Sequence, residues 1–117
     1  MPTVQELMHA NLLEVFGERD PGRRLEAIRR TYTDDVSFAD TEGSVQGHDA
    51  LSAKAQAILD GAPGLVFQLD GDFYQAGNLG YQAWALGPAD EPPVVRGVDM
   101  GLERDGLLKK VYTVVFA

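Results

Sequence analysis

Two aspartates are the residues of this sequence best suited to proton chemistry. Asp40 ends residues 35–40, where apolar and polar side chains alternate, just before a turn. Asp99 lies in a long apolar segment between Gly97 and Gly101, which leave space around its carboxyl group. A carboxyl group removed from water has its pKa raised, so it can stay protonated near neutral pH and donate a hydrogen bond. Two carboxyl groups in unequal surroundings commonly serve as one base and one acid, and we interpret Asp40 and Asp99 as such a pair.

Each aspartate also has an interpretation without chemistry. Asp40 could cap a turn in water, because aspartate satisfies backbone donors at such corners. Asp99 could be a buried acid held by Tyr32 or by a histidine. The two histidines, His9 and His48, lie in different expected helices with no acid at a matching spacing. The sequence therefore predicts no metal site.

The spacing of apolar side chains indicates the elements that must position these residues. Helical spacing predicts three helices, over residues 4–16, 20–32 and 48–60. Alternation with period two predicts a hairpin and then four further strands, over residues 35–40 with 44–46, and 65–75, 78–87, 93–104 and 107–116. Asp34 and Asp35 are expected in a solvated loop after the second helix. Three helices in the N-terminal half followed by a curved antiparallel sheet make an α+β domain.

The expected strand 93–104 carries apolar side chains on both of its faces. One face holds Val98, Met100 and Leu102, and the other holds Asp99 among its glycines. A sheet that helices cover on one side only should present a polar outer face, so we expect another molecule to cover the apolar one. The sequence thus predicts a homodimer formed through the sheet. A different parity on a twisted strand is the alternative explanation.

The composition is that of one folded domain, residues 1–117. The chain has 44% hydrophobic and 24% charged residues, as ordinary globular proteins do, and it is too short for two cores. Its net charge of −8 repels phosphate backbones and anionic membrane surfaces. Neither nucleic acid nor a membrane is therefore an expected partner.

The residue types also exclude some kinds of chemistry. The chain has no cysteine, which excludes a disulfide framework and a thiolate nucleophile or metal ligand. No run approaches the roughly 20 apolar residues of a membrane helix, and the N-terminus lacks a basic segment followed by an apolar one. We expect a soluble, unexported, cytoplasmic protein that uses no cofactor.

Four segments carry a resemblance to known proteins: ERDPGRRLEAI at 18–28, YTDDVSFADTEGSVQGHDAL at 32–51, PGLVFQL at 63–69 and GVDMGLERDGLLKKVY at 97–112. Together they resemble the nuclear-transport-factor-2-like superfamily and, within it, the SnoaL-like branch of polyketide cyclases and ketosteroid isomerases. The resemblance implies a cone-shaped half-barrel whose three helices pack on a strongly curved antiparallel sheet, with a pocket between them. The motifs are more specific for this fold than for a function, because the family includes enzymes, binders and assembly modules.

The ketosteroid isomerase pattern implies roles for three residues. Asp40 matches the general base, Asp99 matches the acid that helps to stabilise an enolate oxygen, and Tyr32 matches the family's tyrosine at the end of the second helix. If the protein is an enzyme, we expect Tyr32 to orient both acids. The sequence departs from the pattern at Phe16, where isomerases have the tyrosine that donates the principal hydrogen bond to the oxyanion. The position of a further pocket tyrosine of the isomerases falls near Ala55, so this side chain is missing as well. Loss of such a donor costs about 10²–10³ in rate, so efficient steroid isomerisation is not expected.

Three functions remain open at this point. The first is cofactor-free proton transfer on an apolar carbonyl compound, leading to isomerisation, cyclisation or dehydration. The second is binding of a small apolar molecule without chemistry, which the phenylalanine at position 16 favours. The third is a dimeric assembly module whose pocket is filled by side chains. The side chains expected to shape a cavity are Phe16, Val36, Phe38, Phe67, Trp84, Val111, Thr113 and Val115.

Overall fold

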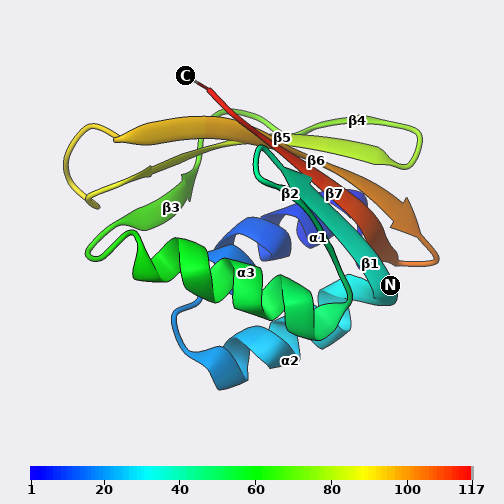
Figure 1. Cartoon of the computed structure of the whole chain (residues 1–117). Coiled ribbons are helices and arrows are strands. Elements are labelled where there is room, and N and C mark those ends of the chain that lie inside the picture. Colours follow the sequence, from blue (N-terminus) through cyan, green and yellow to red (C-terminus); the bar gives the residue numbers. More distant parts are fainter. Residues whose placement is uncertain (117) are drawn as a thin grey trace.

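Three helices cover one face of a curved sheet in the computed structural model, which describes residues 1–116 (Figure 1). The first helix consists of α1 (Val4–Ala10) and a π-helical segment, η1 (Asn11–Phe16), which follows it without a break. The other two are α2 (Pro21–Thr31) and α3 (His48–Asp60). These are the three helices that the apolar spacing predicts.

Local sequence explains where the first two helices begin. At α1 the Thr3 side chain accepts a hydrogen bond from the Glu6 amide, and the Glu6 side chain accepts one from the Thr3 amide. This reciprocal pair satisfies two backbone donors that a helix end leaves free. At α2 the Asp20 side chain accepts from the Arg23 amide at 2.8 Å, and Pro21 follows in the first turn.

The sheet contains seven strands, with bounds β1 (Tyr32–Asp40), β2 (Gly43–Gln46), β3 (Val66–Leu69), β4 (Tyr74–Ala76), β5 (Leu79–Gly87), β6 (Val95–Arg104) and β7 (Leu107–Val115). The strand order is β2-β1-β7-β6-β5-β3, and β4 pairs with β5. All neighbours are antiparallel except β1 and β7, which are parallel. The expected curved antiparallel sheet thus contains one parallel pair, because the elements between β1 and β7 form the long crossover that such a pair requires.

Two expected elements have different bounds in the structure. The segment 65–75 forms two short strands, since the chain leaves the sheet between β3 and β4 where Gly71 has a φ of 89°. Asp34 and Asp35, expected in a loop, lie exposed within β1, next to a register shift between Tyr32 and Ser37. The shift lets β1 continue directly from α2.

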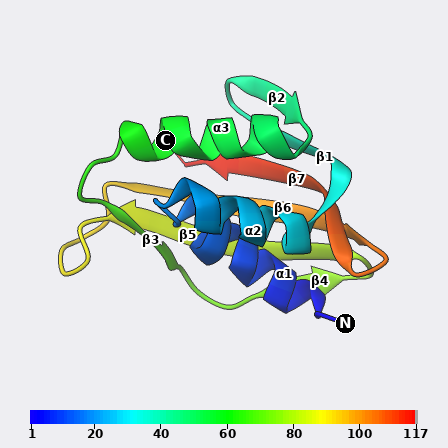
Figure 2. The ribbon, with the colours of Figure 1, turned by 90° about the horizontal axis from the view of Figure 1, so that it is seen from below.

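The helices pack on the concave face of the sheet, and in Figure 2 they lie in front of it. The main core lies between these layers and includes Met8, Ile28, Phe38, Leu108 and Val111. Sequence expectation and structure therefore agree on an α+β cone with its helices on one side.

The other face of the sheet is not covered by any element of the described chain (Figure 1). Tyr112 of β7 is paired with Met100 of β6, and Val114 is paired with Val98. Tyr112 and Val114 are exposed, Met100 is half-buried, and Val98 is buried among its neighbours. The face outside the cone is thus apolar along its middle, as the strand parity predicts.

Candidate functional site

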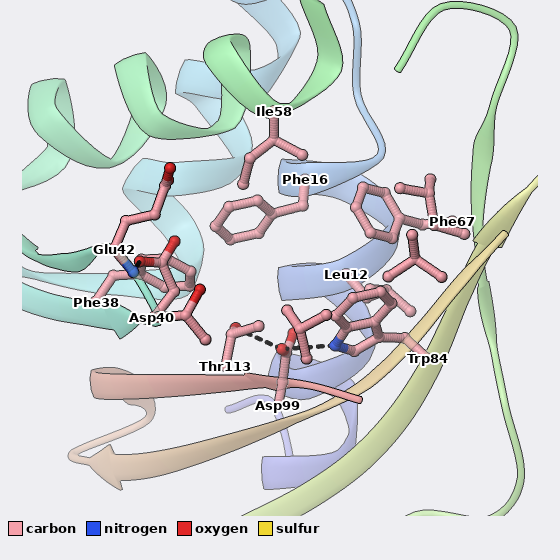
Figure 3. A pocket seen from close by; sticks show the side chains of 14 residues that line it. Leu12, Phe16, Phe38, Asp40, Glu42, Ile58, Phe67, Trp84, Asp99 and Thr113 are labelled. Carbon is pink, nitrogen blue, oxygen red and sulfur yellow. Dashed lines mark hydrogen bonds between the residues drawn. The ribbon is translucent and has the colours of Figure 1, made fainter. Parts of the chain in front are cut away.

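A partly open cavity of about 220 Å³ lies between the sheet, η1 and α3 (Figure 3). The residues that line it are mostly apolar: Leu12, Phe16, Phe38, Asp40, Thr41, Glu42, Ile58, Phe67, Trp84, Leu86, Val95, Asp99, Thr113 and Val115. We call the buried end at Asp99 and Thr113 the floor, and the end at the β1–β2 turn, where Glu42 is exposed, the mouth. Both predicted aspartates face this one space.

Asp99 is the polar centre of the floor. It is only 4% exposed and accepts three hydrogen bonds from side chains. Its Oδ1 accepts from Trp84 Nε1 at 2.9 Å and from Thr113 Oγ1 at 2.6 Å, and its Oδ2 accepts from Asn11 Nδ2 at 2.8 Å (Figure 3 shows the first two). Burial raises the pKa of Asp99 to about 6, whereas the hydrogen bonds from Thr113, Asn11 and Trp84 act to lower it.

Tyr32 holds the side-chain amide of Asn11, which in turn contacts Asp99. Tyr32 is buried, and its hydroxyl group donates to Asn11 Oδ1 at 2.5 Å. Asn11 is fully buried, and because an ionised carboxylate can only accept hydrogen bonds, its Nδ2 faces Asp99 while its Oδ1 faces the Tyr32 hydroxyl group. Burial and then the charge of Asp99 raise the pKa of Tyr32 well above its usual range, which keeps the hydroxyl protonated as a donor. Tyr32 is thus linked to Asp99 through Asn11, and within the described residues no hydrogen bond joins Tyr32 to Asp40.

The geometry of the floor depends on Gly97 and on the π-helical segment. A Cβ atom at Gly97 would lie 2.4 Å from the Trp84 ring, so only glycine allows the indole to reach Asp99 across β6. Segment η1 supplies both Asn11 and two wall residues, Leu12 and Phe16. Single π-helical turns occur often at functional sites, where they redirect side chains.

Asp40 at the mouth has different surroundings. Lys54 Nζ, from α3, lies 2.8 Å from Asp40 Oδ2 and 2.6 Å from Glu42 Oε1. The Glu42 amide donates to Asp40 Oδ1 at 2.9 Å, so Asp40 also caps its turn. The hydrogen bonds to Asp40 and then to Glu42 raise the pKa of Lys54, which keeps this side chain charged. The two carboxyl groups of the cavity are therefore unequal, one in an ion pair and one among neutral donors.

Most of the residues predicted to shape the cavity do line it. They are Phe16, Phe38, Phe67, Trp84, Thr113 and Val115. Val36 and Val111 do not, because both are packed in the main core beside Tyr32. The prediction that these two valines line the cavity was wrong. Strand alternation indicates the face of the sheet on which a residue lies, but it does not indicate whether a helix packs against that residue.

Several residues of the site were not predicted from the sequence. The wall residues Leu12, Ile58, Leu86 and Val95 are ordinary core residues by pattern. Asn11 and Lys54 carried a usable signal, because each is a polar residue within the apolar face of its helix. Asn11 follows Leu7 at a spacing of four residues, and Lys54 precedes Ile58 by four.

Within residues 1–116, no group of three or more histidine, aspartate or glutamate side chains could hold a metal ion. No helix in this part of the chain is long and apolar enough to cross a membrane.

The sequence matches no protein-family model and no curated protein. The structure, in contrast, is similar to many solved structures. A candidate isomerase of the SnoaL-like family from Agrobacterium tumefaciens has a TM-score of 0.87 and 21% identity over 95% of each chain. A candidate ketosteroid isomerase from Kribbella flavida has a TM-score of 0.73 and 17% identity over 97% of this chain and 78% of that one. A candidate SnoaL-like polyketide cyclase from Jannaschia sp. CCS1 has a TM-score of 0.73 and 17% identity over 98% of this chain and 88% of that one.

These similarities define the class of protein as an α+β cone that encloses a pocket between helices and sheet. More particularly, the chain has the nuclear-transport-factor-2-like fold, as its motifs predict. At such low identities the similarity concerns the fold, and the function must be argued from the cavity.

Proposed function

We propose that this protein binds a small, largely apolar carbonyl compound in the cavity and moves a proton on it without a cofactor. The observation that carries the proposal is a buried carboxyl group, Asp99, at the floor of an otherwise apolar cavity. Perturbed carboxyl groups in enclosed pockets are typical of catalytic sites. SnoaL-like isomerases, ketosteroid isomerases and polyketide cyclases among the similar structures support the same kind of chemistry.

The size of the cavity limits the ligand. Pockets for drug-sized molecules have volumes of about 300–1,000 Å³, whereas an apolar cavity of about 150 Å³ holds benzene. At about 220 Å³ the present cavity suits a compound of one or two rings. Aromatic rings of Phe16, Phe67 and Trp84 provide flat apolar walls for such a compound (Figure 3).

In this proposal the two aspartates divide the work. Asp40 at the mouth takes a proton from the carbon next to the carbonyl group, and the Lys54 ammonium group holds its carboxylate in place. Asp99 at the floor exchanges a proton with the ligand oxygen, because a group with a pKa of about 6 both accepts and returns a proton near neutral pH. Asn11 and Tyr32 are positioning residues for Asp99.

Binding can be tested through Trp84, the only tryptophan of the chain. Small apolar ring compounds should shift the Trp84 Nε1–H resonance in a titration followed by NMR. Val95→Phe should weaken this binding at least tenfold by filling part of the cavity that Val95 lines, whereas the neighbouring Val94→Phe should not, because Val94 is 65% exposed and does not line the cavity. Equal binding by both variants would place the ligand elsewhere.

Proton transfer can be tested with 2-hydroxy-1-indanone, a two-ring ketone of suitable size. Incubation in D₂O should place deuterium at the carbon next to the carbonyl group faster with the protein than without it. Asp40→Asn and Asp99→Asn should each reduce this rate by about 10²-fold or more, in the usual range for acid–base groups, while the exposed Asp34→Asn should not. An unchanged rate in Asp40→Asn would remove its assignment as base.

Binding without chemistry is the second candidate, and one observation favours it. Phe16 lines the cavity but has no hydrogen-bond donor, and the donors at the floor are directed at Asp99. If the ketone binds and no deuterium enters it under any condition from pH 5 to 8, the protein is a binding module.

We also propose that two copies associate through the outer face of the sheet. That face is apolar at Tyr112 and Val114 and lacks a covering element in the described chain. Exposed apolar patches of this kind commonly mark protein interfaces.

A further inference from the structure

The polar groups of the cavity floor use all of their own donors on Asp99. The Trp84 indole has a single N–H and no acceptor, and Thr113 has a single O–H. Both donate to Asp99 Oδ1. Asn11 donates to Oδ2 from behind the wall. No donor among these groups remains for a ligand.

Asp99 itself keeps room for one more hydrogen bond. An ionised carboxylate has about four lone-pair sites, and three of them accept from Asn11, Trp84 and Thr113. Because Asp99 also lines the cavity, we assign the fourth site to a ligand bound there. When Asp99 is ionised, as it is above its pKa of about 6, the floor therefore offers an acceptor and lacks a donor.

The mouth of the cavity likewise has more hydrogen-bond acceptors than donors. Asp40 and Glu42 are acceptors there, and Lys54, which donates to both, does not line the cavity. Among the side chains that line the mouth in residues 1–116, Thr41 has the remaining donor, a hydroxyl group in an exposed turn. A ligand with only acceptor groups would thus meet lone pairs at both ends.

We propose that the ligand is a neutral molecule that presents a hydroxyl group to Asp99. This inference rests on the proposed binding function and narrows its ligand class to an alcohol, an enol or a hydroxyl-bearing carbonyl compound. An anion is disfavoured because the cavity already holds carboxylates at both ends and none of the described residues that line it is a lysine or arginine. An ammonium ion has three donors, and only one acceptor site is open at the floor, so the others would be buried without partners.

A matched series of two-ring compounds tests the inference. Indane, 2-indanol, 2-methoxyindane, 2-aminoindane and indane-2-carboxylate have the same skeleton and differ in one polar group. Each is titrated at pH 8 while the Trp84 Nε1–H resonance is followed by NMR, since this group bonds to Asp99 and reports directly on the floor. We expect 2-indanol to bind at least tenfold more tightly than indane and 2-methoxyindane, because hydrogen bonds to charged groups are the strong ones.

A pair of variants separates the hydroxyl contact from general effects. In Asp99→Asn the preference for 2-indanol over indane should fall to less than twofold, while indane itself still binds. The exposed Asp34→Asn should keep the full preference. Far-ultraviolet circular dichroism and the dispersion of the NMR spectrum show whether each variant is folded.

The outcomes distinguish this inference from the proposed function. If indane and 2-methoxyindane bind as tightly as 2-indanol, the cavity binds apolar molecules and the hydroxyl requirement is wrong. If 2-aminoindane or the carboxylate binds most tightly, the ligand is an ion and the inference is overturned. If no member of the series shifts the Trp84 resonance, the binding function itself fails and this inference fails with it.

Discussion

At the scale of single residues, Asp99 lies where a negative charge lowers the stability of the fold. Its neighbours include Asn11, Trp84 and Thr113, which donate hydrogen bonds, and no cation contacts it in the described chain. Charged groups buried without an opposite charge usually destabilise a fold. A core that tolerates this cost is typical of a site kept for function.

The cost of Asp99 should be visible in the pH dependence of stability. Its pKa is about 6 in the folded state against an ordinary value of 3.8. Because the folded state binds the proton more tightly than the unfolded state, the protonated carboxyl group stabilises the fold at a pH below 3.8. This stabilisation is lost as the pH rises through about 6. The loss amounts to about 3 kcal/mol, at about 1.4 kcal/mol per pKa unit. The free energy of unfolding of the natural protein, measured in urea relative to Asp99→Asn, should therefore fall between pH 4 and pH 7.

Asp34→Asn is the matched control for this series, because Asp34 is exposed. Its difference from the natural protein should stay nearly constant over the same pH range. A constant difference for Asp99→Asn as well would mean that Asp99 is hydrated.

Asn11 should control the proton affinity of Asp99. In Asn11→Leu the shape is nearly kept, but the carboxylate loses a donor and the Tyr32 hydroxyl loses its acceptor. The pKa of Asp99, measured from its carboxyl ¹³C shift, should rise further. Asn78→Leu is the control, because Asn78 is exposed, does not line the cavity and donates to the Glu103 carbonyl oxygen. An unchanged pKa in Asn11→Leu would show that Asn11 has no positioning role.

At the scale of elements, the site depends on how closely β5, β6 and η1 approach one another. Trp84 of β5 and Gly97 of β6 are directly paired in the sheet. The missing side chain of Gly97 provides the space that the Trp84 indole occupies. Segment η1 then brings Asn11 and Leu12 down onto the same region.

Gly97→Ala should therefore disturb the floor. Its Cβ would lie 2.4 Å from the Trp84 ring and 2.5 Å from the Val114 carbonyl oxygen, so the indole must move. Overpacking of this kind costs about 1–3 kcal/mol, and the bond to Asp99 should be lost. A large shift of the Trp84 Nε1–H resonance and a lower melting temperature are expected. Gly22→Ala, on α2, should be neutral or slightly stabilising, because its nearest neighbour would be 3.4 Å away. Equal effects of both changes would contradict this account.

At the scale of the whole molecule, the cone has two different surfaces. The concave one is covered by helices, whereas the outer one is the bare face of the sheet (Figures 1 and 2). The cavity lies on the concave side, between the sheet, η1 and α3. A net charge of −8 keeps copies apart unless a specific apolar contact brings them together.

Association through the outer face can be tested by light scattering after size-exclusion chromatography. The natural protein should elute as a dimer, and Val114→Glu should elute as a monomer because it buries a charge in the contact. Leu13→Glu introduces the same charge at an exposed position of η1 and should leave the dimer intact. A monomeric natural protein would refute the dimer.

The sequence by itself determined the elements and the face on which each residue lies. Periodicity of 3.6 and of 2 placed the three helices and the strands β5, β6 and β7 nearly where they occur, because these patterns reflect burial on one side. The same alternation placed Asp99 and its glycines inside the cone. Motifs such as ERDPGRRLEAI also predicted the type of fold, although the sequence as a whole matches no family model.

Only the tertiary structure decided which elements meet. The parallel pairing of β1 with β7 joins segments far apart in the chain, and no local pattern encodes it. The contacts of Asp99 with Asn11, and of Asp40 with Lys54, likewise join residues from different elements. Local spacing fixes a residue's direction along its own helix or strand, but a cavity and the charges around it depend on distances between elements that only packing sets.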